Sequence, residues 1–278
     1  MSGPFLVADN KKNCIMKRYF LVGFLLLVTL FSCNDNPVGP NPNPDPDPNA
    51  VPMAIVLNEG MWSKNDAELS VLYTDGTLRN NFFATSNGRG LGDVAQDAMM
   101  MGGHLYVSVW NSNTLEVVDP QSGKSLKQFI LTGKGPRYMA SDGHFIYLSC
   151  YSRQVLKIDP QSLTVVDSCS LSGMQPEGLA VADGKLFVTS TWQYRSDGSM
   201  EYDNRVSVVD LASFEEIRMI EVPLNPQRIH TAANGQLVLQ TNGNYTSDQG
   251  GLVRIDPATE SGTPLTAEGS NFDLAGNT

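Results

Sequence analysis

Cysteine is scarce in this chain, and its scarcity excludes a fold held together by a framework of disulfides. Of the four cysteines, Cys14 and Cys33 precede the globular region and only Cys150 and Cys169 lie within it. Small secreted proteins that depend on disulfides use several pairs. We therefore expect Cys150 and Cys169 to be buried as small apolar side chains.

Basic residues are also in the minority. The chain has 19 Lys and Arg against 29 Asp and Glu; residues 1–32 hold four basic residues and one Asp, so the remainder has 15 against 28, a net charge of −13. Nucleic-acid binding requires a basic patch, so nucleic acid is not an expected partner. Anionic lipid head groups also repel an acidic surface, so charge does not hold this chain on a membrane.

Motifs of catalysis are missing as well. The sequence has no G-x-S-x-G, no H-E-x-x-H and no glycine-rich phosphate loop. Its three histidines, His104, His144 and His230, have no neighbouring Cys, Glu or Asp at the spacing of zinc ligands. We expect a protein that is not an enzyme, with no catalytic residue, no metal site and no resident cofactor.

What the sequence does have at its start is an export signal. Lys17-Arg18 precedes an apolar run that ends in Ser32-Cys33. The run is shorter than the roughly 20 residues of a membrane-spanning helix, and a small residue before a cysteine resembles a lipobox. We predict a signal peptide over residues 1–32, with Met16 as the true start, and lipidation of Cys33. A single hydrophobic anchor helix is the alternative.

Residues 33–52 follow as a proline-rich tether. The stretch after Cys33 reads NDNPVGPNPNPDPDPN, with no apolar periodicity and too much proline for helix or sheet. Such a segment is extended and solvated, and it holds a folded domain away from a membrane to which only the lipid attaches it; a disordered leader is the alternative. The folded domain is expected over residues 53–278, at the outer membrane or cell surface.

The domain consists of repeats of 40 residues where no insertion intervenes. HLYVSVWNSNTLEVVDPQSG is followed in register by HFIYLSCYSRQVLKIDPQSL, and each third strand ends in an Asp, at Asp119, Asp159, Asp210 and Asp256. Within a unit, four short runs of β-branched and aromatic residues are separated by turn signals such as Asp-Gly and Asp-Pro. No helical period is present. The pattern predicts an all-β chain of four-stranded antiparallel sheets.

Packing considerations select the arrangement of these sheets. One sheet cannot bury both of its faces alone, and radial packing into a β-propeller also protects sheet edges. A stacked β-solenoid is the alternative, but its repeats are usually shorter.

The recurring Asp residues are expected to cap turns rather than to bind metal. Cys150 and Cys169 fall in the second and fourth strands of one unit, beyond the reach of a disulfide.

The repeats resemble the YVTN-type β-propeller family. LYVSVWNSNTLEVVD and LFVTSTW…NRVSVVD carry the likeness, which implies a scaffold more than an activity. About five blades are present. The first begins with a second strand, Ile55 to Asn58, and the last segment is SNFDLAGNT. Either this last segment completes the first blade of a five-bladed ring, or the chain is a truncated seven-bladed propeller. The resemblance favours seven, because YVTN-type propellers usually have at least that number.

The first unit resembles surface lipoproteins of Bacteroidetes. LNEGMW and NGRGLGDVAQ, together with the lipobox and the tether, carry this likeness, and the BtuG-like cobalamin-capturing propellers are among those proteins. The resemblance implies a corrinoid held over one propeller face and passed to a partner, a TonB-dependent transporter of the outer membrane.

One face of the propeller is expected to bind the ligand. Because successive strands alternate in direction, the turns from second to third strands and the connections between blades emerge on the same face, which we call the upper face. Aromatic residues should follow each second strand, and polar residues should surround a central mouth. The predicted ligand-binding residues are Trp62, Trp110, Asn111, Arg137, Tyr151, Glu177, Trp192, Tyr194, Arg228 and Tyr245, with Arg89 and Asp93 also expected at the mouth.

Aromatic rings interspersed with Arg, Asn and acids capture a flat amphipathic ligand or a sugar by stacking and directed hydrogen bonds; the alternative is that each ring only packs between blades. The insertion QYRSDGSMEYD is expected to lengthen the upper face as a loop carrying Tyr194 and Tyr202. We therefore expect a surface lipoprotein that captures a small nutrient. A protein- or glycan-binding scaffold and a propeller hydrolase or quinoprotein-like enzyme are the alternatives.

Overall fold

The structure is a computed structural model that describes residues 44–268. The predicted signal peptide, Cys33 and the final SNFDLAGNT lie outside these residues. Residues 44–51 contain no helix or strand, and Val51 N donates to Thr74 Oγ1 at 3.1 Å, which ties the end of the tether to the first sheet. In the described part of the chain, no helix has the length and apolar character needed to cross a membrane.

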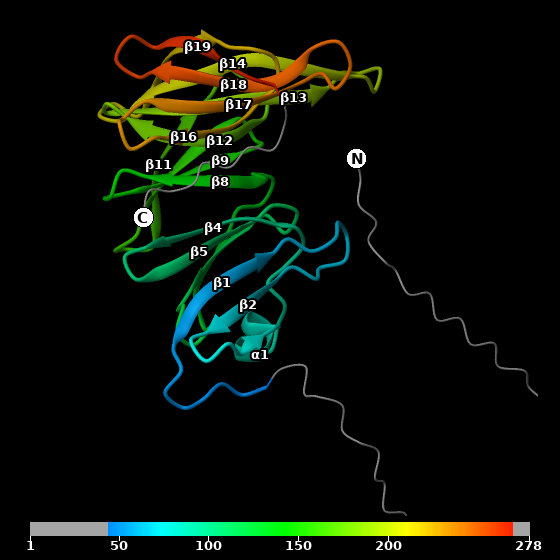
Figure 1. Ribbon diagram of the computed structural model, residues 1–278, viewed down its shortest axis with the longest axis vertical. Helices are drawn as coiled ribbons and strands as arrows, with labels where there is room; N and C mark the ends of the chain where they lie inside the picture. Colours follow the sequence, from blue (N-terminus) through cyan, green and yellow to red (C-terminus); the bar gives the residue numbers. More distant parts are fainter. Residues whose placement is uncertain (1–43, 269–278) are drawn as a thin grey trace, which may run out of the picture. The chain divides into compact units, whose positions relative to one another are not determined.

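The described chain is a β-propeller of five antiparallel sheets, which we number as blades 1 to 5 in chain order (Figure 1). Blade 1 has three strands, β1 (Pro52–Asn58), β2 (Glu68–Tyr73) and β3 (Leu78–Arg79). Blade 2 has β4 (Ala95–Met101), β5 (His104–Val109), β6 (Thr114–Val118) and β7 (Ser125–Ile130). Blade 3 has β8 (Pro136–Ser141), β9 (Ile146–Cys150), β10 (Gln154–Asp159) and β11 (Thr164–Ser170). Blade 4 has β12 (Pro176–Ala182), β13 (Lys185–Tyr194), β14 (Met200–Asp210) and β15 (Glu215–Glu221), and blade 5 has β16 (Pro226–Thr231), β17 (Leu237–Gly243), β18 (Gln249–Asp256) and β19 (Ser261–Glu268).

The predicted fold class is confirmed, and the cores explain why the sheets need one another. Along β5, Leu105 and Val107 pack into a core shared with blade 1, whereas Tyr106 between them packs into a core shared with blade 3. Each further pair of neighbouring blades encloses a core of its own. Because strand side chains alternate between faces, both faces of a blade are apolar and require a neighbour.

Hydroxyl groups on the second strands fix the inner strand of the following blade. Ser108 Oγ donates to Arg137 O at 2.5 Å, Ser149 Oγ to Glu177 O at 2.6 Å, and Thr189 Oγ1 to Gln227 O at 2.9 Å. These bonds satisfy backbone carbonyls that no strand pairing reaches. The same bond recurs from blade to blade, so it places successive inner strands at the same level along the propeller axis.

Two expectations about local structure are confirmed. Asp119 Oδ1 accepts the N–H groups of Gln121 and Ser122 at 2.8 and 3.0 Å, and the other three repeated Asp residues cap their turns in the same way. Hydrogen bonds from these N–H groups lower the pKa of Asp119. Cys150 and Cys169 are buried free thiols.

One helix, α1 (Phe82–Asn87), lies between β3 and β4, so the expectation of a chain without helices was wrong here. The Glu68 carboxylate accepts the N–H groups of Phe83 and Ala84 at 2.9 and 3.0 Å, which satisfies two donors of the first turn. Phe82 and Phe83 are buried in the core between blades 1 and 2. A helix of six residues is too short to show a 3.6-residue period in the sequence.

Candidate ligand-binding face

The upper face carries exposed aromatic side chains. Figure 1 shows the β1–β2, β13–β14 and β17–β18 connections on the same side of the sheets, at the right of the view. Trp62, Tyr194 and Tyr245 lie in or beside these connections with 70%, 65% and 66% of their surface exposed. Exposed aromatic side chains that share one face are typical of surfaces that bind a ligand or a partner.

At the centre, the inner strands place equivalent residues at the mouth of the upper face. The residue after the first residue of each inner strand is Gln96, Arg137, Glu177 and Gln227. We call these four residues the mouth residues. The next residue along each strand is Asp97, Tyr138, Gly178 and Arg228, and we call these four the channel residues. Arg228 is thus one residue beyond the position equivalent to Arg137 and Glu177.

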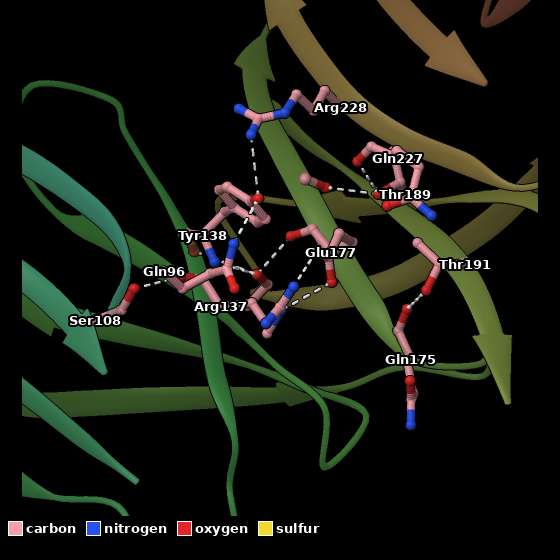
Figure 2. A network of polar contacts seen from close by, with 12 residues as sticks. Gln96, Ser108, Arg137, Tyr138, Gln175, Glu177, Thr189, Thr191, Gln227 and Arg228 are labelled. Carbon is pink, nitrogen blue, oxygen red and sulfur yellow. Dashed lines mark hydrogen bonds and ion pairs between the residues drawn. The ribbon is translucent and has the colours of Figure 1, made fainter. Parts of the chain in front are cut away.

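Two of the mouth residues pair with each other. Arg137 Nε donates to Glu177 Oε2 at 2.9 Å, and Arg137 Nη2 donates to Glu177 Oε1 (Figure 2). The guanidinium carbon lies 4.5 Å from the ring centroid of Tyr151 and 5.4 Å from that of Trp110. Burial alone would lower the pKa of Arg137, but Glu177 outweighs it and the pKa is raised. Burial and the charge of Glu177 also raise the pKa of Tyr151. The structure therefore brings four predicted site residues into one cluster.

Tyr138 extends this cluster toward blades 2 and 5 and was missed by the sequence analysis. Gln96 Nε2 donates to the Tyr138 hydroxyl at 2.7 Å, and Arg228 Nη2 donates to the same oxygen at 3.4 Å (Figure 2). The Arg228 guanidinium carbon lies 5.2 Å from the Tyr138 ring centroid. Burial, followed by the charge of Glu177, raises the pKa of Tyr138. The position of Tyr138, two residues after the proline that begins the inner strand, is the sequence signal that would have placed it in this cluster.

The insertion in blade 4 is a hairpin arm, and the expectation of a loop was wrong. Strand β13 runs on to Tyr194 and β14 begins at Met200, with Trp192 facing Tyr202 across the strands. The ring centroids of Trp192 and Tyr194 are 5.1 Å apart in an edge contact. The cross-strand pairing of Trp192 with Tyr202 stabilises a hairpin that polar turn residues alone would leave flexible.

This arm is braced by both neighbouring blades. On the side of blade 3, Arg153 Nη2 donates to Gln193 Oε1 at 2.6 Å. On the side of blade 5, the rings of Tyr202 and Tyr245 lie 6.2 Å apart in an edge contact. Contacts with both neighbouring blades therefore hold the arm in place on the upper face.

The predicted aromatic residues form separate groups rather than an even ring. The rings of Trp110 and Tyr151 are in edge contact at 6.0 Å between centroids. In blade 4 the equivalent position is Thr191, since Thr191 N donates to Gln175 O as Tyr151 N does to Gly135 O. Trp192 is consequently shifted outward by one residue, and it joins the group on the arm.

Asn111 lies in the β5–β6 turn of blade 2, beside the β1–β2 connection of blade 1. Asn111 Nδ2 donates to Asp93 Oδ2 at 2.6 Å, and Ser63 N donates to the same oxygen at 2.9 Å. The buried Asp93 side chain therefore holds the turn of Trp62 against that of Asn111.

Arg89 is not at the mouth, so this expectation was wrong. Arg89 Nη2 lies 2.7 Å from Glu116 Oε1 of strand β6, and its guanidinium carbon is 4.8 Å from the Phe83 ring centroid. The Glu116 side chain is wholly buried and requires a cation nearby. Among the residues that the structure describes, no three His, Cys, Asp or Glu side chains are grouped so that they could hold a metal ion.

A family model described as Domain of unknown function (DUF5074) matches residues 54–267. A search of the curated proteins finds no match.

Three solved structures are similar to parts of this chain. Hydrazine synthase of Kuenenia stuttgartiensis is 20% identical with a TM-score of 0.51, covering 60% of this chain and 48% of its own. Glutaminyl cyclase of Myxococcus xanthus is 18% identical with a TM-score of 0.43, covering 59% and 66%. The WD40 β-propeller domain of Doa1 is 10% identical with a TM-score of 0.46, covering 64% and 58%. The chain thus spans about half to two thirds of the solved chains that it matches, and the likeness concerns the fold alone.

Proposed function

This chain belongs to the family described as Domain of unknown function (DUF5074), and we propose that it is a non-catalytic binding module whose upper face captures a small, flat, amphipathic ligand. A β-propeller suggests a binding scaffold, because its turns present residues from several blades on one rigid surface. The observation that carries the proposal is the set of exposed aromatic residues on this one face, Trp62, Tyr194 and Tyr245.

The Arg137–Glu177 ion pair supports this function because it orders the residues at the centre of the upper face. The rings of Trp110 and Tyr151 lie against the Arg137 guanidinium, which is hydrogen-bonded to Glu177. Binding to a surface that is already ordered loses less conformational entropy, so affinity is higher. The β13–β14 arm adds the aromatic side chains of Trp192 and Tyr194 at the side of these central residues.

We propose a corrinoid as the ligand. A corrin ring is broad and flat enough to stack on aromatic groups from several blades, and its amide side arms exchange hydrogen bonds with Asn, Arg and acidic groups. The sequences LNEGMW and NGRGLGDVAQ of the first unit support this choice by their resemblance to cobalamin-capturing surface lipoproteins. In this proposal, lipidated Cys33 and the tether hold the propeller at the cell surface, where it passes the ligand to a TonB-dependent transporter.

Isothermal titration calorimetry with cyanocobalamin tests the proposal. We expect saturable binding that Tyr245→Ala and Trp110→Ala each weaken by about tenfold or more, because each removes a stacking ring. Leu126→Ala is the matched control, since Leu126 is 47% exposed near the start of the outer strand β7, at the end away from the upper face. Absence of heat from a folded protein would contradict the corrinoid assignment.

A further inference from the structure

The channel residues line an open pocket below the upper face, which we call the cavity. Asp97, Tyr138, Gly178 and Arg228 line it together with Met139, Leu179, Ile229 and His230, and its volume is about 110 Å³. A volume of this size holds a small molecule of a few heavy atoms. A corrin ring cannot enter it.

Gly178 explains how residues of three blades meet at this cavity. Arg228 of blade 5 reaches Tyr138 of blade 3 across the intervening strand β12, as Figure 2 shows. The residue of β12 at the equivalent position is Gly178, which has no side chain to obstruct the guanidinium. A Cβ atom at Gly178 would lie 2.5 Å from Gln227 O, so glycine also permits strands β12 and β16 to approach.

Arg228 and Tyr138 offer donors to the cavity. Arg228 has no acidic group within ion-pair distance among residues 44–268. The Tyr138 hydroxyl accepts hydrogen bonds from Gln96 and Arg228, so its own hydrogen remains for another acceptor. A guanidinium and a hydroxyl that point at one space are a binding site for a carboxylate.

Asp97 supplies the opposite charge from strand β4. Its Oδ2 accepts the N–H of Met139 at 2.8 Å, which fixes the carboxylate beside Tyr138. A carboxylate accepts about four hydrogen bonds, so capacity remains for a ligand. Burial raises the pKa of Asp97, and the charge of Arg228 partly offsets this, so the two groups act on each other electrostatically.

The two opposite charges decide the class of ligand. A simple anion at Arg228 would be repelled by Asp97, and a simple cation at Asp97 would be repelled by Arg228. We propose that the cavity binds a small zwitterion of the α-amino acid class, whose carboxylate accepts from Arg228 and the Tyr138 hydroxyl and whose ammonium group donates to Asp97. This site is separate from the upper-face site, and neither depends on the other.

Calorimetric titration of the full chain with glycine, in the absence of any corrinoid, tests this assignment. Glycine is expected to bind saturably, and acetate and methylammonium, which each carry one half of its charge, are expected to bind about tenfold more weakly or worse. Arg228→Gln and Asp97→Asn should each weaken glycine binding by at least about tenfold. Arg254→Gln, which changes an exposed arginine on β18, and Trp110→Ala should leave it unchanged.

Three results would overturn the assignment. Equal binding of acetate and glycine would mean a site for anions only. Unchanged glycine affinity in folded Arg228→Gln and Asp97→Asn would place the bound glycine elsewhere. No saturable binding of glycine, alanine or serine by the folded wild-type chain would exclude the class.

Discussion

Arg137 and Glu177, the equivalent residues of two successive inner strands, form an ion pair of two hydrogen bonds that joins blade 3 to blade 4. The two side chains are only 11% and 5% exposed. Because Trp110 and Tyr151 lie against the guanidinium, this pair determines where the two rings stand on the upper face.

Glu177→Ala should lower the free energy of unfolding by about 3 kcal/mol, because it leaves the Arg137 charge nearly buried without its partner. Urea denaturation measures this. The control is Glu201→Gln, which breaks the partly exposed pair with Arg195 at 3.4 Å and should lower stability by no more than about 1 kcal/mol. A loss at Glu177 no larger than that at Glu201 would mean that the inner pair is not a tie between blades.

Gly178→Ala should destabilise the protein by about 1–3 kcal/mol, since the new methyl group would lie 2.5 Å from Gln227 O and force β12 and β16 apart. Gly90→Ala is the control, because no atom lies nearer than 3.6 Å to a Cβ placed there. Thermal unfolding of both variants provides the comparison. Equal melting temperatures would show that the inner strands do not pack this closely.

The two thiols of the propeller should be inert in the native state. Burial raises the pKa of Cys150 to about 12 and that of Cys169 to about 11. Since only the thiolate reacts, a disulfide reagent at pH 8 should label neither until the protein unfolds. The measurement uses a chain with Cys14 and Cys33 replaced by Ser. Rapid labelling of either thiol in the folded protein would show that the sheets of blade 3 open locally.

Asp97→Asn should stabilise the protein at neutral pH. Burial raises the native pKa of Asp97 above 3.8, with partial offset from the Met139 N–H and Arg228, so the folded state binds this proton more tightly than the unfolded chain. The resulting stability is present below about pH 3.8 and is lost as pH rises through the native pKa. Melting temperatures of the two proteins should converge as pH falls from 7 toward 4. A variant less stable at pH 7 would contradict this.

The fold could be predicted because the signals repeat. The Asp at the end of each third strand caps its turn in blades 2 to 5, and the alternation seen in Leu105, Tyr106 and Val107 requires a neighbour on both faces. The β13–β14 arm could not be predicted in the same way. Its turn residues Ser196 to Ser199 are polar and suggest a loop, whereas the pairing of Trp192 with Tyr202 depends on strand register.

The site could be predicted only in part. The sequence indicates which residues lie near the mouth, but not that Arg137 and Glu177 neutralise each other or that Arg228 lies one residue farther along its strand. These relationships depend on the level of each inner strand along the propeller axis. Hydrogen bonds such as that from Ser149 Oγ to Glu177 O set this level. Asp97 and Tyr138 were missed for the same reason.

The central claim is that the upper face binds the ligand, and tryptophan fluorescence tests it most directly. The chain has three tryptophans, Trp62, Trp110 and Trp192, and all of them lie on the upper face. Titration with cyanocobalamin, corrected for light absorption with free N-acetyltryptophanamide, should give a saturable change in emission with the same midpoint as the calorimetric titration. A corrected emission that stays constant while calorimetry shows binding would place the ligand away from this face and contradict the account.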